Sequence, residues 1–148
     1  MPLPQRYTIS LMHEEEVKIL EDWAFREGWN PGLSDLTIAR RADPECFVAL
    51  REGNELVGGG SIMSYSGQFG FMGLFIIRND LRKKGLGAEL WYWRRDRLLK
   101  RLTSSATIGM DGVYNMVSFY EKGGFKSAHR DVRYQGIATG EKSPEVVE

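Results

Sequence analysis

A short basic segment with two glycines, residues 82–88, joins an apolar run at 69–77 to a helical pattern at 86–102; it is Arg-Lys-Lys-Gly-Leu-Gly-Ala. Gly85 and Gly87 allow the backbone to approach a ligand closely, and a helix start leaves several N–H groups without partners. Such a helix start binds phosphate, and the basic side chains add positive charge beside it. The segment therefore predicts an anion site at a strand-to-helix turn, with a plain turn as the alternative.

Two other phosphate-binding motifs do not fit this segment. A dinucleotide-binding fingerprint needs a third glycine where Leu90 stands, and a P-loop ends in Gly-Lys-Ser/Thr. The Gly-x-Gly spacing alone is a weak signal, so the surrounding charge has to be considered as well.

Charge is distributed unevenly along a chain whose net charge is zero. The 148 residues include 20 Lys and Arg and 20 Asp and Glu, so no overall field attracts nucleic acid or an anionic membrane. Residues 78–101 nevertheless hold nine bases and three acids, whereas residues 14–45 hold nine acids and four bases. The bases surround the glycine turn, which favours a local anion site; solvated helix faces are the alternative.

The length is typical of one domain, and the composition is typical of a soluble globular protein. Cys46 is the only cysteine, which excludes an internal disulfide and a site built from several thiolates. The first residues lack a secretory pattern, and no apolar run approaches the roughly 20 residues that cross a bilayer. We therefore expect a soluble, cytoplasmic protein with no membrane or nucleic-acid partner.

Periodicity and turn residues predict an ordered series of strands and helices. Strands are expected at 7–11, 46–50, 55–65, 69–77, 106–110 and 125–135, and helices at 13–27, 34–41, 86–102 and 116–122. An antiparallel meander followed by βαβ crossovers predicts an α+β (mixed α/β) fold with helices on the faces of the sheet. The apolar stripe of the longest helix is expected to contain Leu86, Leu90, Trp93, Leu99 and Leu102.

Two segments resemble motifs of a known family. Residues 75–87 resemble the acetyl-CoA-binding motif of the GCN-five-related N-acetyltransferases (GNAT), Arg/Gln-x-x-Gly-x-Gly/Ala after the fourth strand. Residues 119–125, Phe-Tyr-Glu-Lys-Gly-Gly-Phe, resemble the second motif of the same family. Asn79 stands where a proline is common, and Val113 where many members have asparagine; neither change removes a group that the mechanism needs.

The resemblance implies the GNAT fold, a mostly antiparallel mixed sheet of about six or seven strands with about four helices and a V-shaped opening between strands four and five. It implies one N-acetyltransferase domain at 1–140, followed by a flexible tail at 141–148. A narrower resemblance, to the first domain of the bacterial YitH-like acetyltransferases, rests on residues 27–32, 108–113 and 130–134. Those proteins typically carry a second domain, so acceptor specificity that such a domain supplies is in question here.

The same resemblance implies acetyl-CoA as the cosubstrate and no metal. In the family, pantetheine lies along the fourth strand like an added strand, which here would use the backbone of Phe75, Ile76 and Ile77. The pyrophosphate would lie against the glycine turn, which consists of Arg82, Lys83, Lys84, Gly85, Leu86, Gly87 and Ala88.

Acetyl transfer to an amine needs a neutral nucleophile, a polarised thioester and a protonated leaving thiolate. By resemblance, the N–H of Ile77 polarises the carbonyl and Tyr120 protonates the thiolate, with aromatic packing as the alternative role of Tyr120. Asp111 is the candidate base or amine-binding carboxylate, with a turn role as the alternative. The elements that border the acceptor site in the family here contain Asn30, Asp35 and Tyr65.

These expectations describe an N-acetyltransferase that passes the acetyl group of acetyl-CoA directly to a primary amine in a ternary complex. The acceptor is an amine-bearing small molecule, a protein N-terminus or a lysine, and homodimers are common in the family. A non-catalytic acyl-CoA-binding or sensory module is the alternative. RNA binding by the basic helix is a third hypothesis; it would need aromatic platforms beside the charges, but Trp93 of that helix belongs to the apolar stripe.

Overall fold

The computed structural model describes residues 3–134, 136 and 137. Helices and strands follow one another in the expected order, and nearly all begin and end within one or two residues of the expected positions. They are β1 (Tyr7–Leu11), α1 (Glu14–Arg26), α2 (Asp35–Ala42), β2 (Phe47–Glu52), β3 (Glu55–Tyr65), β4 (Phe69–Ile77), α3 (Leu86–Leu99), β5 (Thr107–Met110) and α4 (Val117–Lys122). Short 3₁₀ turns stand at Asn79–Leu81 and Tyr114–Met116.

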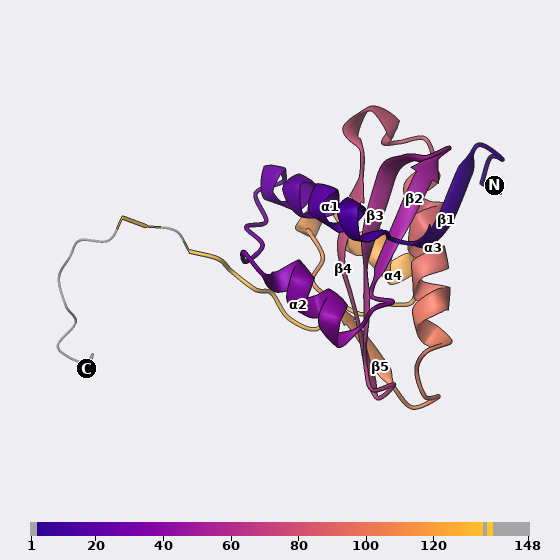
Figure 1. The fold of residues 1–148 in the computed structure, drawn as a ribbon. Helices are drawn as coiled ribbons and strands as arrows, with labels where there is room; N and C mark the ends of the chain where they lie inside the picture. The colour runs from indigo at the N-terminus through magenta and orange to yellow at the C-terminus, as the bar shows by residue number, and fades with distance from the viewer. Residues whose placement is uncertain (1–2, 135, 138–148) are drawn as a thin grey trace.

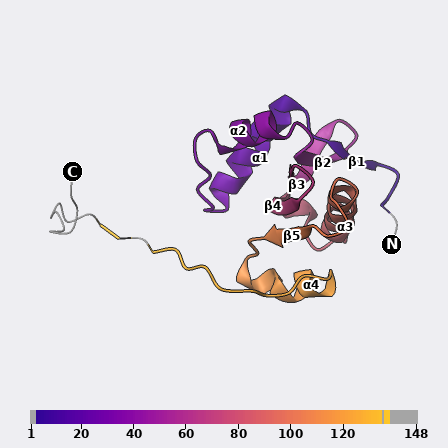
Figure 2. The ribbon, with the colours of Figure 1, turned by 90° about the horizontal axis from the view of Figure 1, so that it is seen from below.

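The strands form one mixed sheet with helices on both faces, so the predicted α+β fold is confirmed. The order across the sheet is β1-β2-β3-β4-β5, antiparallel throughout except for the parallel pair of β4 and β5. Helices α1 and α2 cover one face, and α3 and α4 lie on the other (Figures 1 and 2). Strands β4 and β5 are parallel and are joined through α3. Such connections are right-handed, which fixes the face of the sheet on which α3 lies.

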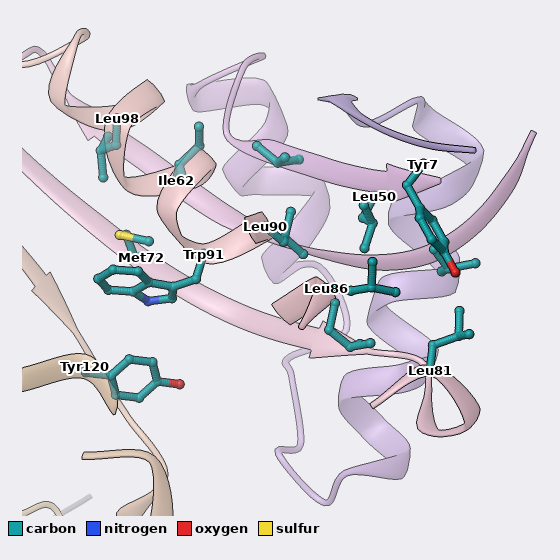
Figure 3. Close-up of a cluster of buried hydrophobic side chains, with 13 residues drawn as sticks. Tyr7, Leu50, Ile62, Met72, Leu81, Leu86, Leu90, Trp91, Leu98 and Tyr120 are labelled. Atoms are coloured by element: carbon teal, nitrogen blue, oxygen red, sulfur yellow. The ribbon is translucent and has the colours of Figure 1, made fainter. Parts of the chain in front are cut away.

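Each face of the sheet has its own hydrophobic core. The core beneath α3 and α4 includes Leu50, Ile62, Met72, Leu90, Trp91 and Leu98 (Figure 3). The core beneath α1 and α2 includes Val17, Leu20, Ala24, Leu36 and Phe47. The strands between them are therefore buried on both sides, which holds the central sheet rigid relative to the helices.

Strands β4 and β5 pair over only part of their length. Their register runs from Phe69 opposite Thr107 to Met72 opposite Met110, and β4 then continues to Ile77 beside β3 alone. We call this parting of the strands beyond Met72 the β4–β5 split. It corresponds to the V-shaped opening that the resemblance implies.

A bulge lies in β4 where the split begins. Gly73 is opposite Ser61 and Ile76 is opposite Gly59, so Leu74 and Phe75 together face Gly60. Leu74 has a φ of 48°, a left-handed conformation that is unfavourable for a branched side chain. Its side chain packs against the α1 and α2 core and that of Phe75 against the α3 core, so both helical layers hold the bulge in place.

Two details of the described chain differ from the sequence expectation. The described sheet has five strands rather than six or seven, because residues 126–134, expected as part of a last strand, are exposed and pair with no strand. That segment is mostly polar and lacks an apolar face to hold it against a sheet. Helix α3 ends at Leu99 rather than at residue 102, and the expected tail at 141–148 lies outside the described residues.

The buried stripe of α3 also differs from the expected one. The buried residues are Leu86, Leu90, Trp91, Arg94 and Leu98, whereas Leu99, expected in the stripe, is 51% exposed. Trp91 takes a central place because three rings, those of Phe119, Tyr120 and Phe125, pack around it. The longest helix therefore faces the sheet through a row that includes one arginine.

Helix α4 ends against Trp91 through a glycine that has no room for a side chain. A Cβ atom at Gly123 would overlap the six-membered ring of the Trp91 indole. We expect Gly123→Ala to lower the free energy of unfolding by about 1–3 kcal/mol, because the indole is fully buried and cannot move aside. Denaturant unfolding measures the change, and Gly136→Ala, at a position with open space, is the control. An unchanged midpoint for Gly123→Ala would contradict this packing.

A buried ion pair connects the start of α1 to β2. Both oxygens of the Glu16 carboxylate accept hydrogen bonds from Arg51, at 2.6 Å from Nε and 2.5 Å from Nη2. The remaining Arg51 donors reach the hydroxyl of Ser10 at 2.6 Å and the carbonyl of Leu11 at 3.2 Å. Both charged groups of the pair are thus hydrogen-bonded, and the pair anchors the first helix to the sheet.

Candidate active site

The basic turn between β4 and α3 exposes a series of backbone donors. Lys83 and Gly85 both have left-handed φ values, 63° and 84°, and the helix begins at Leu86. The N–H groups of Ala88 and Glu89 turn back to the carbonyl of Gly85, at 3.1 Å and 3.4 Å. Within the described part of the chain, the N–H groups of residues 83–87 have no hydrogen-bond partner. This arrangement of donors at a helix start binds anions.

The three basic side chains of the turn do not have the same surroundings. Arg82 donates from Nε to the carbonyl of Ile77 at 2.8 Å and forms an ion pair with Glu27 at the end of α1. Its guanidinium therefore links the end of β4 to the first helix. Lys83 and Lys84 are exposed on the same turn. Arg82 is exposed as well, but its guanidinium is held by Ile77 and Glu27.

The backbone of β4 presents a donor to the split. Arg78 donates its N–H to the carbonyl of Val57 on β3 at 2.9 Å. Backbone groups alternate in direction along a strand. The N–H of Ile77 therefore points away from β3, into the split, while the backbone N–H and C=O of Ile76 are directed to β3. The carbonyl of Ile77 is already occupied by Arg82. Of the three expected backbone positions, Ile77 thus has its N–H directed into the split, whereas the backbone groups of Ile76 are directed to β3.

Phe75 brings the bulge of β4 against the start of α3. A Cβ atom at Gly87 would lie 3.4 Å from Cζ of Phe75 and 3.7 Å from Cγ1 of Ile77. The second glycine of the turn therefore lies in close contact with the end of β4. The basic turn at residues 82–88 is therefore packed against the end of β4 where the β4–β5 split lies.

Tyr120 lies on α4 beside Trp91, with its ring centroid 6.2 Å from that of the indole (Figure 3). Gly112, just after β5, packs against the same ring, so the side chain is held between α3 and the end of β5. Burial raises the pKa of Tyr120, and the nearby Arg94 partly opposes this effect. The phenol therefore keeps its proton at neutral pH and can donate it.

The candidate acceptor residues lie in two separate places. Asn30 and Asp35 flank the connection from α1 to α2, where Asp35 accepts the N–H of Gly32 at 2.8 Å. Tyr65 ends β3 at the β3–β4 hairpin, 53% exposed, with its ring 5.8 Å from that of Phe69. The structure thus brings Asn30 and Asp35 into one region and Tyr65 to the paired end of β4. Asp111 is exposed, one residue beyond β5.

Arg94 is the residue near this site that sequence reasoning missed. It is 1% exposed and lies between α3 and the sheet, beside Tyr120 and Phe75. A signal was available, because Leu86, Leu90, Arg94 and Leu98 follow one another at four-residue spacing, which places them on one helix face.

Two further observations limit the chemistry of the described residues. No group of three or more His, Cys, Asp or Glu side chains in the described ranges is arranged to hold a metal ion. In the same part of the chain, no helix is both long enough and apolar enough to cross a membrane.

Residues 13–125 match the acetyltransferase (GNAT) family, and the chain therefore belongs to this family of acyltransferase enzymes. The match contains the basic turn at residues 82–88, the β4–β5 split and Tyr120. The resemblance noted in the sequence is confirmed at the level of the family.

Known proteins are similar to this chain in sequence or in fold. Holothin acyltransferase from Pseudoalteromonas sp. (strain SANK 73390) is 29% identical over 133 residues, which are 90% of this chain and 44% of that protein. This chain thus spans less than half the length of that curated relative. Among solved structures, Ard1 from Thermoplasma volcanium has a TM-score of 0.69 at 18% identity, covering 84% of this chain and 85% of its own.

Glucosamine-6-phosphate N-acetyltransferase from Arabidopsis thaliana is a second similar structure, with a TM-score of 0.64 at 14% identity. The match covers 87% of this chain and 97% of that one. At such identities the two structures agree with this chain in fold alone.

Proposed function

We propose that this protein transfers the acetyl group of acetyl-CoA to a primary amine by direct attack in a ternary complex. The observation that carries the proposal is the contact between the anion-binding turn and the β4–β5 split through Gly87 and Phe75. One ligand can therefore reach both places at once. Acetyl-CoA has a pyrophosphate for the turn and an extended amide-containing arm for the open side of β4.

The turn and the strand divide the recognition of this cosubstrate between them. The free N–H groups of residues 83–87 bind the pyrophosphate, and Lys83 and Lys84 add charge from solvent. The arm lies along β4 like an added strand, and the N–H of Ile77 is its nearest backbone donor at the split. In this arrangement the N–H of Ile77 polarises the thioester carbonyl.

The chemistry then requires two proton movements. An amine with a pKa of about 10.4 must lose a proton before it attacks, and Asp111 beyond β5 is the carboxylate proposed to assist. The leaving thiolate must gain a proton, and Tyr120 is the proposed donor because its phenol is protonated at neutral pH. Both residues follow β5 in the chain.

The acceptor is proposed only by its chemistry, an amine of a small molecule, a protein N-terminus or a lysine. Asn30 and Asp35 on the α1–α2 connection, together with Tyr65, are the proposed acceptor contacts. Because the name of the relative from Pseudoalteromonas refers to holothin, that compound belongs in an acceptor panel beside polyamines, amino acids and peptides.

Acetyl-CoA should raise the melting temperature, and one charge reversal should weaken its binding. Lys84→Glu is expected to lower the affinity for acetyl-CoA about tenfold, because it places a negative charge beside the pyrophosphate. Titration with acetyl-CoA measures the affinity, and Lys100→Glu, at the other end of α3, is the matched control. Release of free CoA across the acceptor panel measures turnover.

The outcomes separate the two functional hypotheses. The absence of any stabilisation at saturating acetyl-CoA would overturn the proposal. Stabilisation without turnover on any amine of the panel would instead favour a non-catalytic acyl-CoA-binding module.

A further inference from the structure

A buried arginine in the sheet-facing row of α3 is the most unusual charge in the molecule. Arg94 is 1% exposed and stands between Leu90 and Leu98, where an apolar side chain would fill the same space. A charged group in such a place costs several kcal/mol unless neighbouring groups compensate for it. Its contacts therefore show what the charge does.

Arg94 packs directly against the bulge of β4. Its Nη2 donates to the carbonyls of Ser61 and Gly73, both at 2.6 Å, and these residues are opposite each other where the register shifts. The guanidinium covers Gly60, where any Cβ atom would overlap it, and its Cζ lies 5.4 Å from the ring centroid of Phe75. The group is thus fixed at the point where β4 leaves β5.

The positive charge is only partly neutralised. Nε and Nη1 of Arg94 are buried and have no hydrogen-bond partner among the described residues. Burial lowers the pKa of Arg94 to about 9, so the guanidinium still carries its charge near neutral pH. No described carboxylate pairs with it, so the carbonyls of Ser61 and Gly73 are the only described acceptors for this charge.

Tyr120 is the ionisable group that interacts electrostatically with this charge. Arg94 lies one helical turn beyond Trp91 on α3, and Trp91 packs against the ring of Tyr120. Strand β4 contains no ionisable residue, and the ionisable ends of β3, Glu55 and Tyr65, are exposed. On α3 itself, Arg95 pairs with Asp96 and Arg97 pairs with Glu45 at the surface. On α4, Glu121 and Lys122 are exposed.

We propose that Arg94 is a positioning residue for acyl transfer: it holds the bulge of β4 and places a fixed positive charge that stabilises the Tyr120 phenolate. This inference rests on the proposed function. The O–H bond of Tyr120 breaks as the S–H bond of CoA forms, so the proton moves from oxygen to sulfur and the phenol becomes a phenolate. Solvent then returns a proton to the phenolate. A nearby cation favours the charged product of this step.

Arg94→Met tests the role of the charge, and Arg94→Lys restores a charge at the same position. In Arg94→Met the pKa of Tyr120 should rise by about one unit or more, and kcat should fall about tenfold. The high-pH limb of the pH profile of kcat should shift to higher pH by the same amount, because Tyr120 then loses its proton at a higher pH. Arg94→Lys should return the pKa of Tyr120 and the limb toward their wild-type positions.

Ultraviolet titration of phenolate formation measures the pKa of Tyr120, as the difference between each protein and the same protein with Tyr120→Phe. This titration needs no substrate, so it distinguishes a failure of this inference from a failure of the proposed function, which would show as absence of turnover. If Arg94→Met does not fold, Arg94→Gln keeps a donor for the carbonyls without the charge. An unchanged pKa of Tyr120 and an unmoved kcat limb in the neutral variant would overturn the inference.

Discussion

Tyr120→Phe is expected to lower kcat about 100-fold while the affinity for acetyl-CoA stays within about twofold of wild type. The change removes the phenolic proton that the leaving thiolate needs, and it leaves the ring in its packing against Trp91 and Gly112. Steady-state kinetics with the best amine of the panel measures kcat. Acetyl-CoA titration of the same protein measures the affinity.

Tyr92→Phe is the control for this variant, because Tyr92 lies on α3 beside the same indole but is 40% exposed. It should retain the kcat of the wild type. Equal kcat values for Tyr120→Phe and the wild type would show that Tyr120 acts through packing alone, which the sequence left open as its alternative role.

Glu16→Ala is expected to lower the free energy of unfolding by about 3–5 kcal/mol near neutral pH. The substitution leaves the guanidinium of Arg51 buried without its carboxylate, although Ser10 and Leu11 still accept two of its hydrogen bonds. Glu15→Ala changes an exposed acid in the same helical turn and should alter stability by less than about 0.5 kcal/mol. Denaturant unfolding of both variants measures the contrast.

The effect of Glu16→Ala should depend on pH in a defined direction. Burial acts to raise the pKa of Glu16, but the hydrogen bonds from Arg51 and His13 and the charge of Arg51 lower it below its ordinary value. A carboxyl group with a lowered pKa contributes stability above its unfolded value of about 4.3 and loses it as pH falls through the folded value. The difference between the wild type and Glu16→Ala should therefore shrink in acid. A constant difference from neutral to strongly acidic pH would contradict the ion pair.

The meander of β2, β3 and β4 could be predicted from the sequence because each of its signals is local. Gly53 and Asn54 mark the first turn, and Gly67 marks the second, with apolar runs between them. The anion-binding turn is local as well, because two glycines and the end of a strand lie within a few residues. Periods and turn residues report on such features directly.

The parts that could not be predicted depend on contacts between distant residues. The ion pair of Arg82 with Glu27 joins residues 55 positions apart, and the place of Arg94 depends on the bulge of another strand. The strand expected at 125–135 shows the reverse case, because the described part of this segment finds no partner in the described sheet. The candidate acceptor residues likewise come from different elements, with Tyr65 at the end of β3 and Asn30 and Asp35 at the α1–α2 connection.

Leu74 occupies a left-handed backbone position where glycine would be less strained, and so its side chain must compensate by packing. Leu74 packs in one core and Phe75 in the other, so straightening β4 would break the packing contacts of both side chains at once. The split is therefore preorganised: acetyl-CoA, if it binds there as proposed, would not have to compete with β5 for the end of β4. Little of its binding free energy would then go into reshaping the protein, and more of it would remain available to orient the thioester.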